Sequence, residues 1–479
     1  MTEKDTEKKE INLLKLLWPI FILAGFFSVG MGGIFILMVP LSFIFWPDEP
    51  FHAFEMGLLI TSILWGLAIS GILKSRLVDN HKINRVRILF IFTFFRGICM
   101  IMLSFAQEGK GFEAWLYFYV IALVLSVVGG GNYNNVFSLS HDIVPSSQRS
   151  RFFGFYAIFR SVFMLIGFIL SGLLVQLGYW RLFFITNGLC LIIMAVIVVI
   201  KIKEPKRGVQ REELMDVLQD DSIKYDFKLD KEMMRKTMFS KTNLVALIEG
   251  IFTSIFLGSL IILILPYIQT PPHNFSPLVT GIFLALFGLT GGLIGQVLLS
   301  RVSDRISHGD KIKNRLYFII AALTVGGFSF ILMFFLPLPH LSVEQGSDIL
   351  FFFSFPIIWI FGAIRVISRS ISSLYEINQP PILQEINLPE AQGRIMAWNR
   401  FLESVGFGSG PVIAGILIIM TGYNYQLVAI IISAIAIPGI ILWIFALRYF
   451  EEDRQFIKKI LAERAEILKS RKNEISENL

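Results

Sequence analysis

The chain has 479 residues, of which 54% are hydrophobic and only 16% are charged, and its mean hydropathy is +0.67. Soluble domains carry roughly 25% charged residues, so the composition excludes an ordinary soluble protein and indicates one that spans a membrane. The net charge of +7 does not indicate nucleic-acid binding, because the basic residues collect at the ends of apolar runs, as in membrane proteins.

Twelve apolar runs, each long enough for a helix across a ~30 Å hydrocarbon core, are separated by polar breaks. Only helices and closed barrels satisfy their backbone in lipid, so we expect an all-α protein with twelve transmembrane helices. The first run has no cleavage site and is expected to remain in the mature protein. The expected spans, one to twelve, are residues 13–46, 54–77, 86–106, 114–140, 152–176, 181–201, 243–268, 278–300, 315–337, 349–375, 395–421 and 425–448.

The loops differ in charge between the two sides of these spans. The loops of one side are poor in lysine and arginine and often acidic, as in "WPDEPFHAFE" and "PLPHLSVEQGSD". The positive-inside rule makes the other side cytoplasmic and places both termini there, with the cell membrane as the expected location. The basic residues of that side are Lys74, Arg76, Lys82, Arg85, Arg87, Arg149, Arg151, Lys201, Lys203, Lys206, Arg207, Arg301, Arg305, Lys311, Lys313, Arg315 and Arg394.

A hydrophilic segment divides the chain into two halves. Residues 1–12 form a cytoplasmic N-terminus, residues 13–201 a first six-helix bundle, residues 202–242 a cytoplasmic linker, residues 243–448 a second six-helix bundle, and residues 449–479 a cytoplasmic tail. The linker and the tail have the periodicity of amphipathic surface helices. The apolar side of the tail contains Phe456, Ile457, Ile460, Leu461, Ile467 and Leu468.

The second half repeats short stretches of the first. "SRLVD" at 75–79 recurs as "SRVSD" at 300–304, and "KINR" at 82–85 recurs as "KIKNR" at 311–315. Residues 144–149 match 388–393 without a gap. Both matches give the halves the same membrane orientation, so we expect a parallel repeat with its axis along the membrane normal.

The two six-helix halves, the long cytoplasmic linker between them and the basic loop after spans two and eight together resemble the major facilitator superfamily. The resemblance implies two bundles that rock about a central cavity. In this sequence the loop motif falls on Gly71, Arg76, Asp79 and Arg85 in the first half and on Gly295, Arg301, Asp304 and Arg305 in the second. We call these eight the gating residues and interpret Arg76, Asp79 and Arg85 as candidates for a cytoplasmic latch between the halves that holds the outward-open state.

Within the superfamily, three stretches resemble the Spinster-like branch: "GGGNYNN" at 129–135, "SQRSR" at 147–151 and "KEPKRG" at 203–208. That resemblance implies a lipid-type substrate. The branch usually carries a glutamate in span four, where this chain has Gly130, and an acid in span one, where this chain has none. The proton-linked carboxylates of the branch are therefore not inherited.

Glu249 is the only acid well inside span seven, and it has no basic residue three or four positions away. Ionisable residues inside spans usually mark a pathway. A carboxylate in a cavity of low dielectric constant can take up and release a proton, so Glu249 is our candidate for coupling to protons. The alternative is a fixed salt bridge to an arginine of another helix.

Arg365 and Arg369 lie four residues apart in span ten, and Glu376 continues the same helical stripe. Guanidinium groups match carboxylate or phosphate geometry, so this stripe suits an anionic headgroup. The alternative is that Glu376 or Glu249 neutralises the two arginines structurally.

The other polar residues expected deep in the spans carry an excess of positive charge. Arg96, Arg160 and Arg400 join the two arginines of span ten, and Glu403 is expected to pair with Arg400. The excess indicates an anionic or zwitterionic substrate.

An amide cluster in span four, Asn132, Asn134 and Asn135, corresponds in the repeat to Glu376, Asn378 and Gln379 of span ten. The cluster either faces the cavity or serves a gate or helix packing. "GLTGGLIG" at 288–295 predicts close helix packing.

Together these features predict a secondary active transporter that moves a small organic, anionic or lysolipid-like substrate by alternating access. A proton-coupled exporter of drugs or organic anions and a non-transporting membrane sensor are the alternatives. We expect no enzyme activity, cofactor, metal or nucleic-acid partner, and we expect a monomer in the bilayer. The sequence contains no nucleotide-binding GxxxxGK[ST] motif, and neither its 2 cysteines nor its 6 histidines have the spacing of metal ligands.

Overall fold

A computed structural model describes residues 12–79, 84–130, 132–144, 148–205 and 237–477. Every regular element in these ranges is helical, and 12 helical segments are long and apolar enough to cross a membrane. The expected all-α fold with twelve spans is therefore confirmed.

Seven helices form the first half: α1 (Leu13–Phe45), α2 (Ala53–Asp79), α3 (Arg85–Leu103), α4 (Phe112–Gly129), α5 (Asn132–Ile143), α6 (Arg149–Gln176) and α7 (Trp180–Lys201). The second half begins with α10 (Lys241–Gln269), followed by span eight as α11 (Pro277–Phe283), η2 (Leu284–Leu289), α12 (Thr290–Leu293), η3 (Ile294–Leu299) and α13 (Ser300–Ile306). It continues with η4 (Gly309–Lys313), α14 (Asn314–Phe335), η5 (Gln345–Ser347), α15 (Ile349–Phe353), α16 (Pro356–Glu385), α17 (Pro389–Met420), α18 (Tyr425–Ile435) and α19 (Ile437–Glu477).

Span four is not one helix, as the apolar run predicted, but two. α4 ends at Gly129 and α5 begins at Asn132. The carbonyl groups of the last turn of α4 lose their helical partners there, and Lys74 of α2 donates to two of them: its Nζ lies 2.5 Å from Val127 O and 2.7 Å from Val128 O. The charge of Lys74 also complements the negative end of the helix dipole.

Span eight alternates α-helical and π-helical turns, and it lies close against α16. A Cβ at Gly291 would lie 2.8 Å from Val366 O, and one at Gly295 would lie 2.5 Å from Ser370 O. Only glycine fits at such distances, so the predicted packing role of the glycine-rich stretch 288–295 is confirmed for Gly291 and Gly295, whereas Gly288 and Gly292 face open space. The π-helices η2 and η3 lie in this same contact region.

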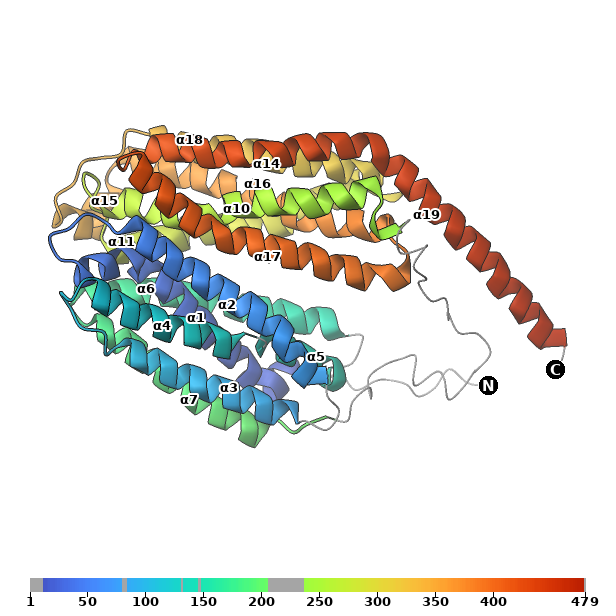
Figure 1. Ribbon diagram of the computed structural model, residues 1–479, viewed down its shortest axis with the longest axis horizontal. Helices are drawn as coiled ribbons and strands as arrows, with labels where there is room; N and C mark the ends of the chain where they lie inside the picture. Colours follow the sequence, from blue (N-terminus) through green and yellow to red (C-terminus); the bar gives the residue numbers. More distant parts are fainter. Residues whose placement is uncertain (1–11, 80–83, 131, 145–147, 206–236, 478–479) are drawn as a thin grey trace.

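The helices form two groups, α1 to α7 and α10 to α19, which converge at one end of the molecule and diverge at the other (Figure 1). We call the divergent end the basic end, because Lys201, Arg301, Arg305 and Lys311 lie there, and we call the other the opposite end. One apolar core at the opposite end contains residues of both groups, such as Phe45 and Phe275. Toward the basic end each group has its own core, and among the described residues no shared apolar core joins the two groups there.

Contacts between the two groups lie in the half of the molecule toward the opposite end. α2 packs on α17, where a Cβ at Gly57 would lie 2.5 Å from Pro411 O, and the backbone N–H of Val412 donates to Thr61 Oγ1 over 3.1 Å. α6 packs on α11, where a Cβ at Gly172 would lie 2.6 Å from Pro277 O.

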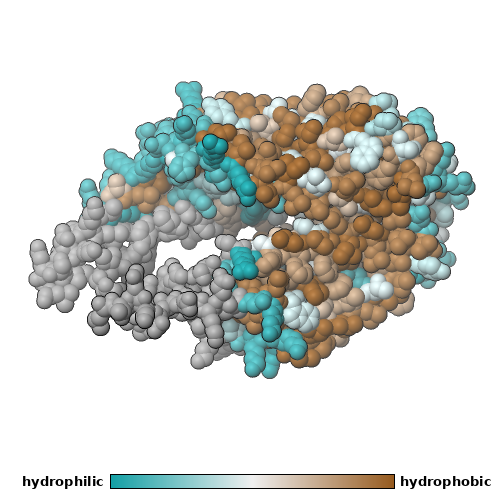
Figure 2. Space-filling view, turned by 180° about the vertical axis from the view of Figure 1, so that it is seen from behind, coloured by the Kyte–Doolittle hydropathy of each residue, from teal (hydrophilic) through white to brown (hydrophobic). Residues whose placement is uncertain are grey.

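Beyond these contacts the groups separate. Along the part of α2 whose side chains are described, the last side-chain hydrogen bond to α17 is that of Trp65, and Ile69 and Leu73 toward the basic end are exposed. The space-filling view shows the two lobes parted by a gap that opens toward the basic end, whereas they meet in a continuous apolar surface elsewhere (Figure 2). The structure is thus open at the basic end and closed at the opposite end.

The tail continues span twelve without a break, since α19 runs from Ile437 to Glu477. Its apolar residues Ile457 and Ile460 pack into a small core against α17, and Arg454 bonds to Glu385 over 2.7 Å. The expected surface helix therefore begins as part of the second bundle, although Phe456 and Leu461 are exposed. Most of the predicted linker, residues 206–236, lies outside the described residues.

Candidate functional site

Glu249 lies in α10 with no solvent exposure, surrounded by helices of the second bundle. The Thr253 hydroxyl, one turn further along α10, donates to its Oε1 atom, and the Tyr375 hydroxyl of α16 donates to Oε2 over 3.2 Å. Gly439 of α19 closes the site, because a Cβ there would lie 3.3 Å from Glu249 Cγ. The described residues place no cation within ion-pair distance of this carboxylate, so the alternative of a salt bridge to an arginine finds no support among them.

A chain of buried hydrogen bonds connects Glu249 with a second carboxylate. Gln379 Nε2 donates to Tyr375 Oη over 2.9 Å, and Asn399 Nδ2 donates to Gln379 Oε1 over 3.2 Å and to Glu403 Oε1 over 2.8 Å. Glu403 accepts a further bond from Arg400 Nη1 over 3.1 Å, which confirms the expected pair. We call Glu249, Tyr375, Gln379, Asn399 and Glu403 the carboxylate network. Arg400, 67% exposed, lies at its outer end.

The two arginines of α16 have different surroundings. Arg369 Nη1 lies 3.3 Å from Glu376 Oε1, and both side chains are partly exposed. Arg365 makes no ion pair among the described residues, and its buried Nε atom has no hydrogen-bond partner. Glu376 therefore neutralises one arginine at most, and Glu249 neutralises neither.

The other arginines expected deep in the spans fall into two groups. Arg160 and Arg400 are exposed, so the expectation that they are buried is wrong. Arg96 is buried in the first bundle, with its guanidinium 4.8 Å from the Phe27 ring and against Gly129. Spacing along a helix gives depth in the membrane but not the direction of a side chain, which explains the error.

Two asparagines of span four, Asn132 and Asn135, point into the first bundle. Asn132 is 2% exposed and donates to Thr93 Oγ1 over 3.5 Å, and Asn135 is 1% exposed and donates to Arg85 O over 2.8 Å. Their proposed contact with a substrate is therefore not supported here, and the packing alternative is favoured. The side chain of Asn134 lies outside the described residues.

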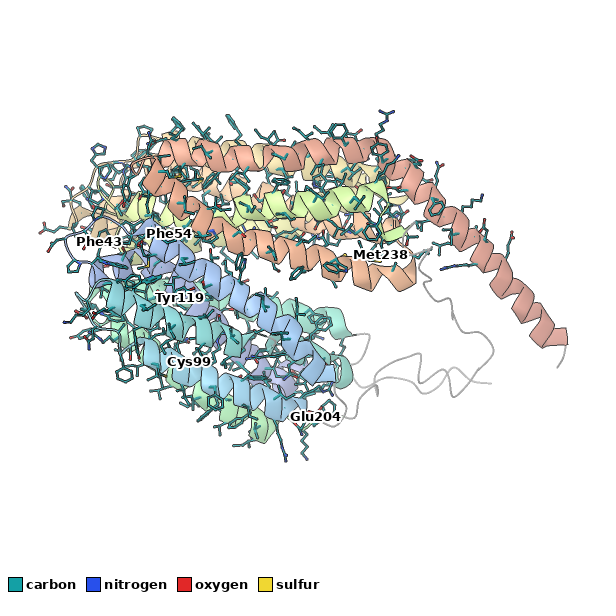
Figure 3. The ribbon with its side chains drawn as sticks, viewed as in Figure 1. Phe43, Phe54, Cys99, Tyr119, Glu204 and Met238 are labelled. Atoms are coloured by element: carbon teal, nitrogen blue, oxygen red, sulfur yellow. The ribbon has the colours of Figure 1, made fainter. Side chains whose placement is uncertain are left out.

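The gating residues of the first half lie at the basic end. Gly71 is buried in α2, but the side chains of Arg76 and Asp79 lie outside the described residues. Arg85 is 1% exposed and donates to Glu204 Oε1 over 2.7 Å and to Ser138 Oγ over 3.0 Å. Glu204 lies just beyond α7 at the basic end (Figure 3), so these contacts are all within the first bundle.

The second half repeats this arrangement with Arg315, which the echo aligns with Arg85. Arg315 donates to Asn378 Oδ1 over 3.1 Å and to Asp304 Oδ1 over 2.7 Å. Arg301 and Arg305 are exposed. No latch bond between the bundles is found among the described residues, as expected when the basic end is open, and the latch of the outward-open state stays a prediction.

A separate cavity of about 740 Å³ lies at the opposite end, between loops of both halves. Asp48 and Glu49 line it from the first half, and His273, His340 and Tyr423 line it from the second. It is remote from the carboxylate network, which lies toward the basic end, and it forms an outer vestibule above the closed contact of the bundles.

Sequence reasoning missed most of the carboxylate network. Tyr375 was not singled out, and Gln379 and Asn399 were not connected to Glu249, because the partners come from three different helices. The spacing of Tyr375, Glu376 and Gln379 on one helix was the available signal, but only the packing of α10 and α17 on α16 brings the network together.

Comparison with known proteins identifies the class of this chain. The sequence pattern of the Major Facilitator Superfamily matches residues 20–373, so the chain belongs to this family of transporters. A comparison with curated proteins finds no match.

Solved structures share the fold at low sequence identity. A bacterial homologue of the human lysosomal transporter Spinster, in an inward-facing and unoccupied conformation, is 16% identical with a TM-score of 0.70, over 92% of this chain and 98% of that one. The nucleoside transporter NupG is 13% identical with a TM-score of 0.63, over 92% and 99%. The POT family transporter PepTSo is 12% identical with a TM-score of 0.66, over 91% and 98%.

Proposed function

We propose that this chain moves a small organic anion, and specifically a lysolipid-like amphiphile, across the cell membrane by alternating access. The observation that carries this proposal is Arg365, a guanidinium in the middle of span ten that lacks an acidic partner among the described residues. Arg369 lies one turn further along α16. An unpaired guanidinium in a span is costly and is expected where a ligand supplies the opposite charge.

The position of the two arginines along α16 supports the same reading. Arg369 is the fourteenth residue of a 30-residue helix, about 20 Å from its first residue at a rise of 1.5 Å per residue, and so near the membrane midplane. A partly exposed arginine at that depth is stable in water but not in lipid. We therefore infer that Arg365 and Arg369 face the water-filled gap between the bundles.

The orientation follows from the basic end. Its lysines and arginines favour the cytoplasm, so the structure is the inward-open state, with both termini inside. The resemblance of the sequence to the Spinster-like branch supports a lipid-type substrate, and the fold shared with the inward-facing Spinster homologue supports the inward-open conformation.

The test is binding of lysolipids to the purified protein, measured as a shift in thermal unfolding. Lysolipids with an anionic phosphate headgroup should stabilise the protein more than a neutral monoacylglycerol of the same chain length. Arg365→Gln and Arg369→Gln should remove this difference, and Lys459→Gln, at an exposed tail position, should not. Equal stabilisation by neutral and anionic lipids would refute an arginine-based headgroup site. Binding without transport would favour the sensor alternative.

A further inference from the structure

We propose that the carboxylate network binds the coupling proton, with Glu249 as the group that is protonated and α17 as the element that links its protonation to the rocking of the bundles. This proposal rests on the proposed transport function, whose coupling ion it specifies. It does not depend on which organic substrate is carried.

The first step is the isolation of Glu249. Its carboxylate is 0% exposed, and its hydrogen-bond partners are two neutral hydroxyl groups. An ionised carboxylate without a cation is strongly disfavoured in such surroundings, whereas a neutral acid is tolerated. Glu249 can therefore change its charge by taking up one proton, which forms an O–H bond and breaks none within the protein.

The second step concerns the other charged and titratable groups that face Glu249. α10 contributes the Thr253 hydroxyl, α16 contributes the Tyr375 phenol, and α17 contributes Glu403 with Arg400 beyond it. From α19 the neighbours are Gly439 and the neutral indole of Trp443. Glu403 has Arg400 as its cation and can stay ionised, so the uncompensated site is Glu249.

The third step is an unused donor and an unused acceptor in the network. Trp443 Nε1 lies beside Glu249 and is buried without a hydrogen bond of normal geometry, and Asn399 Oδ1 is buried without a donor. Buried polar groups are normally paired, and each exception calls for an explanation. An acid that alternates between two protonation states explains the unpaired indole of Trp443, because the ionised form of Glu249 needs a further donor and the protonated form does not.

The fourth step connects the site to the motion of the bundles. Glu403 lies on α17, which packs on α10 at Gly250, where a Cβ would lie 3.2 Å from Glu403 Cγ. Two residues further along α17, Val405 O accepts a hydrogen bond from Trp65 of the first bundle over 3.1 Å. A shift of α17 caused by a charge change at Glu249 would therefore reach the contact that holds the opposite end closed.

The experiment reads protonation without reference to any substrate. Infrared difference spectra of the purified full-length protein between acidic and alkaline pH should contain a carboxylic-acid C=O band that is lost in Glu249→Gln. Glu452→Gln, an exposed acid of the same bundle, should leave this band in place. Tyr375→Phe keeps both carboxylates and should shift the pH at which the band changes, which a merely structural tyrosine would not do.

Flux in liposomes completes the test. Glu249→Gln should still exchange substrate across the membrane but should not concentrate it in response to a pH gradient. An unchanged infrared band in Glu249→Gln, or unchanged accumulation driven by pH, would overturn the proposal. If even the wild-type protein carries no substrate, the transport function fails, while the infrared band still decides whether Glu249 binds a proton.

Discussion

Trp65 in α2 donates a hydrogen bond from Nε1 to the backbone oxygen of Val405 in α17 over 3.1 Å. This bond joins the two bundles at the point where α2 and α17 begin to separate toward the basic end. A Cβ at Gly408, one turn further along α17, would lie 2.1 Å from the Trp65 ring, so the indole fits against glycine alone.

Trp65→Phe should weaken the closed contact of the opposite end and shift the protein toward its outward-open state. The lost hydrogen bond is worth about 0.5–1.5 kcal/mol, so the population ratio should change by up to about tenfold. Distances between spin labels on the two bundles at the basic end measure this ratio. Trp359→Phe is the matched control, because its Nε1 donates to Phe353 O over 2.9 Å within the second bundle alone. Equal distance distributions for both variants would contradict the role of Trp65.

Gly130→Ala should destabilise the first bundle. A Cβ there would lie 1.7 Å from Ser70 Oγ and 2.6 Å from Leu67 O, and overpacking of this kind costs about 1–3 kcal/mol. The glutamate that the Spinster-like branch usually carries at this place would be excluded for the same reason. Gly154→Ala is the control, since no atom lies within 4 Å of its Cβ position. Thermal unfolding in detergent should separate the two variants, and an unchanged melting temperature for Gly130→Ala would refute the packing described here.

Arg85→Gln should cost more stability than Arg315→Gln, although the two arginines occupy equivalent places in the repeat. Arg85 is 1% exposed and its partner Glu204 is 23% exposed, so the loss should be large but below the value of about 3–5 kcal/mol for a fully buried pair. The partner of Arg315, Asp304, is 63% exposed, so water replaces the lost bond. Denaturation of both variants measures their free energies of unfolding and shows which substitution costs more stability. The reverse order would show that Arg85 serves the latch between the bundles more than the packing of its own bundle.

Glu108 links the loop after α3 to the start of α7, and its contribution to stability should depend on pH. Trp180 Nε1 donates to its carboxylate over 2.8 Å and Arg181 pairs with it, and these interactions lower the pKa of Glu108, the Trp180 bond most strongly. A lowered folded-state pKa gives stability above the ordinary glutamate value of about 4.3, which is lost as the pH falls through the folded-state value.

Glu108→Gln should therefore lower the free energy of unfolding at neutral pH by less than about 1 kcal/mol, because the carboxylate is half exposed, and should have no effect at strongly acidic pH. Glu113→Gln, an exposed acid at the start of α4, provides the control. A loss of the same size at both pH values would show that shape, and not charge, matters at this position.

Hydropathy and charge predicted the twelve spans and the division into two halves because a lipid solvent imposes a long apolar run on every crossing helix. The break at Gly130 was not predicted, since glycine and asparagine there leave the run apolar enough to count as one span. The bond from Lys74 to the α4 carbonyl groups, which holds the break, joins residues more than fifty positions apart.

The candidate site was predicted unevenly for a related reason. Glu249 and the Arg400–Glu403 pair could be singled out, because an acid inside a span and charges three residues apart are visible in one helix. The hydrogen bond from Tyr375 to Glu249 and the connection to Glu403 through Gln379 and Asn399 could not, since these residues come from other helices. The exposure of Arg160 was also not predicted, because the position of a residue along a helix does not give the direction of its side chain.

Uptake of a radiolabelled lysolipid with an anionic headgroup into liposomes that contain the purified protein tests the proposed transport. The wild-type protein should take up this lipid faster than a neutral monoacylglycerol, and Arg365→Gln should reduce the uptake of the anionic lipid to the rate of the neutral one, while Lys459→Gln keeps the wild-type rate. Uptake by Arg365→Gln equal to that of the wild type, or no uptake above empty liposomes, would contradict transport of an anionic amphiphile through the arginines of α16.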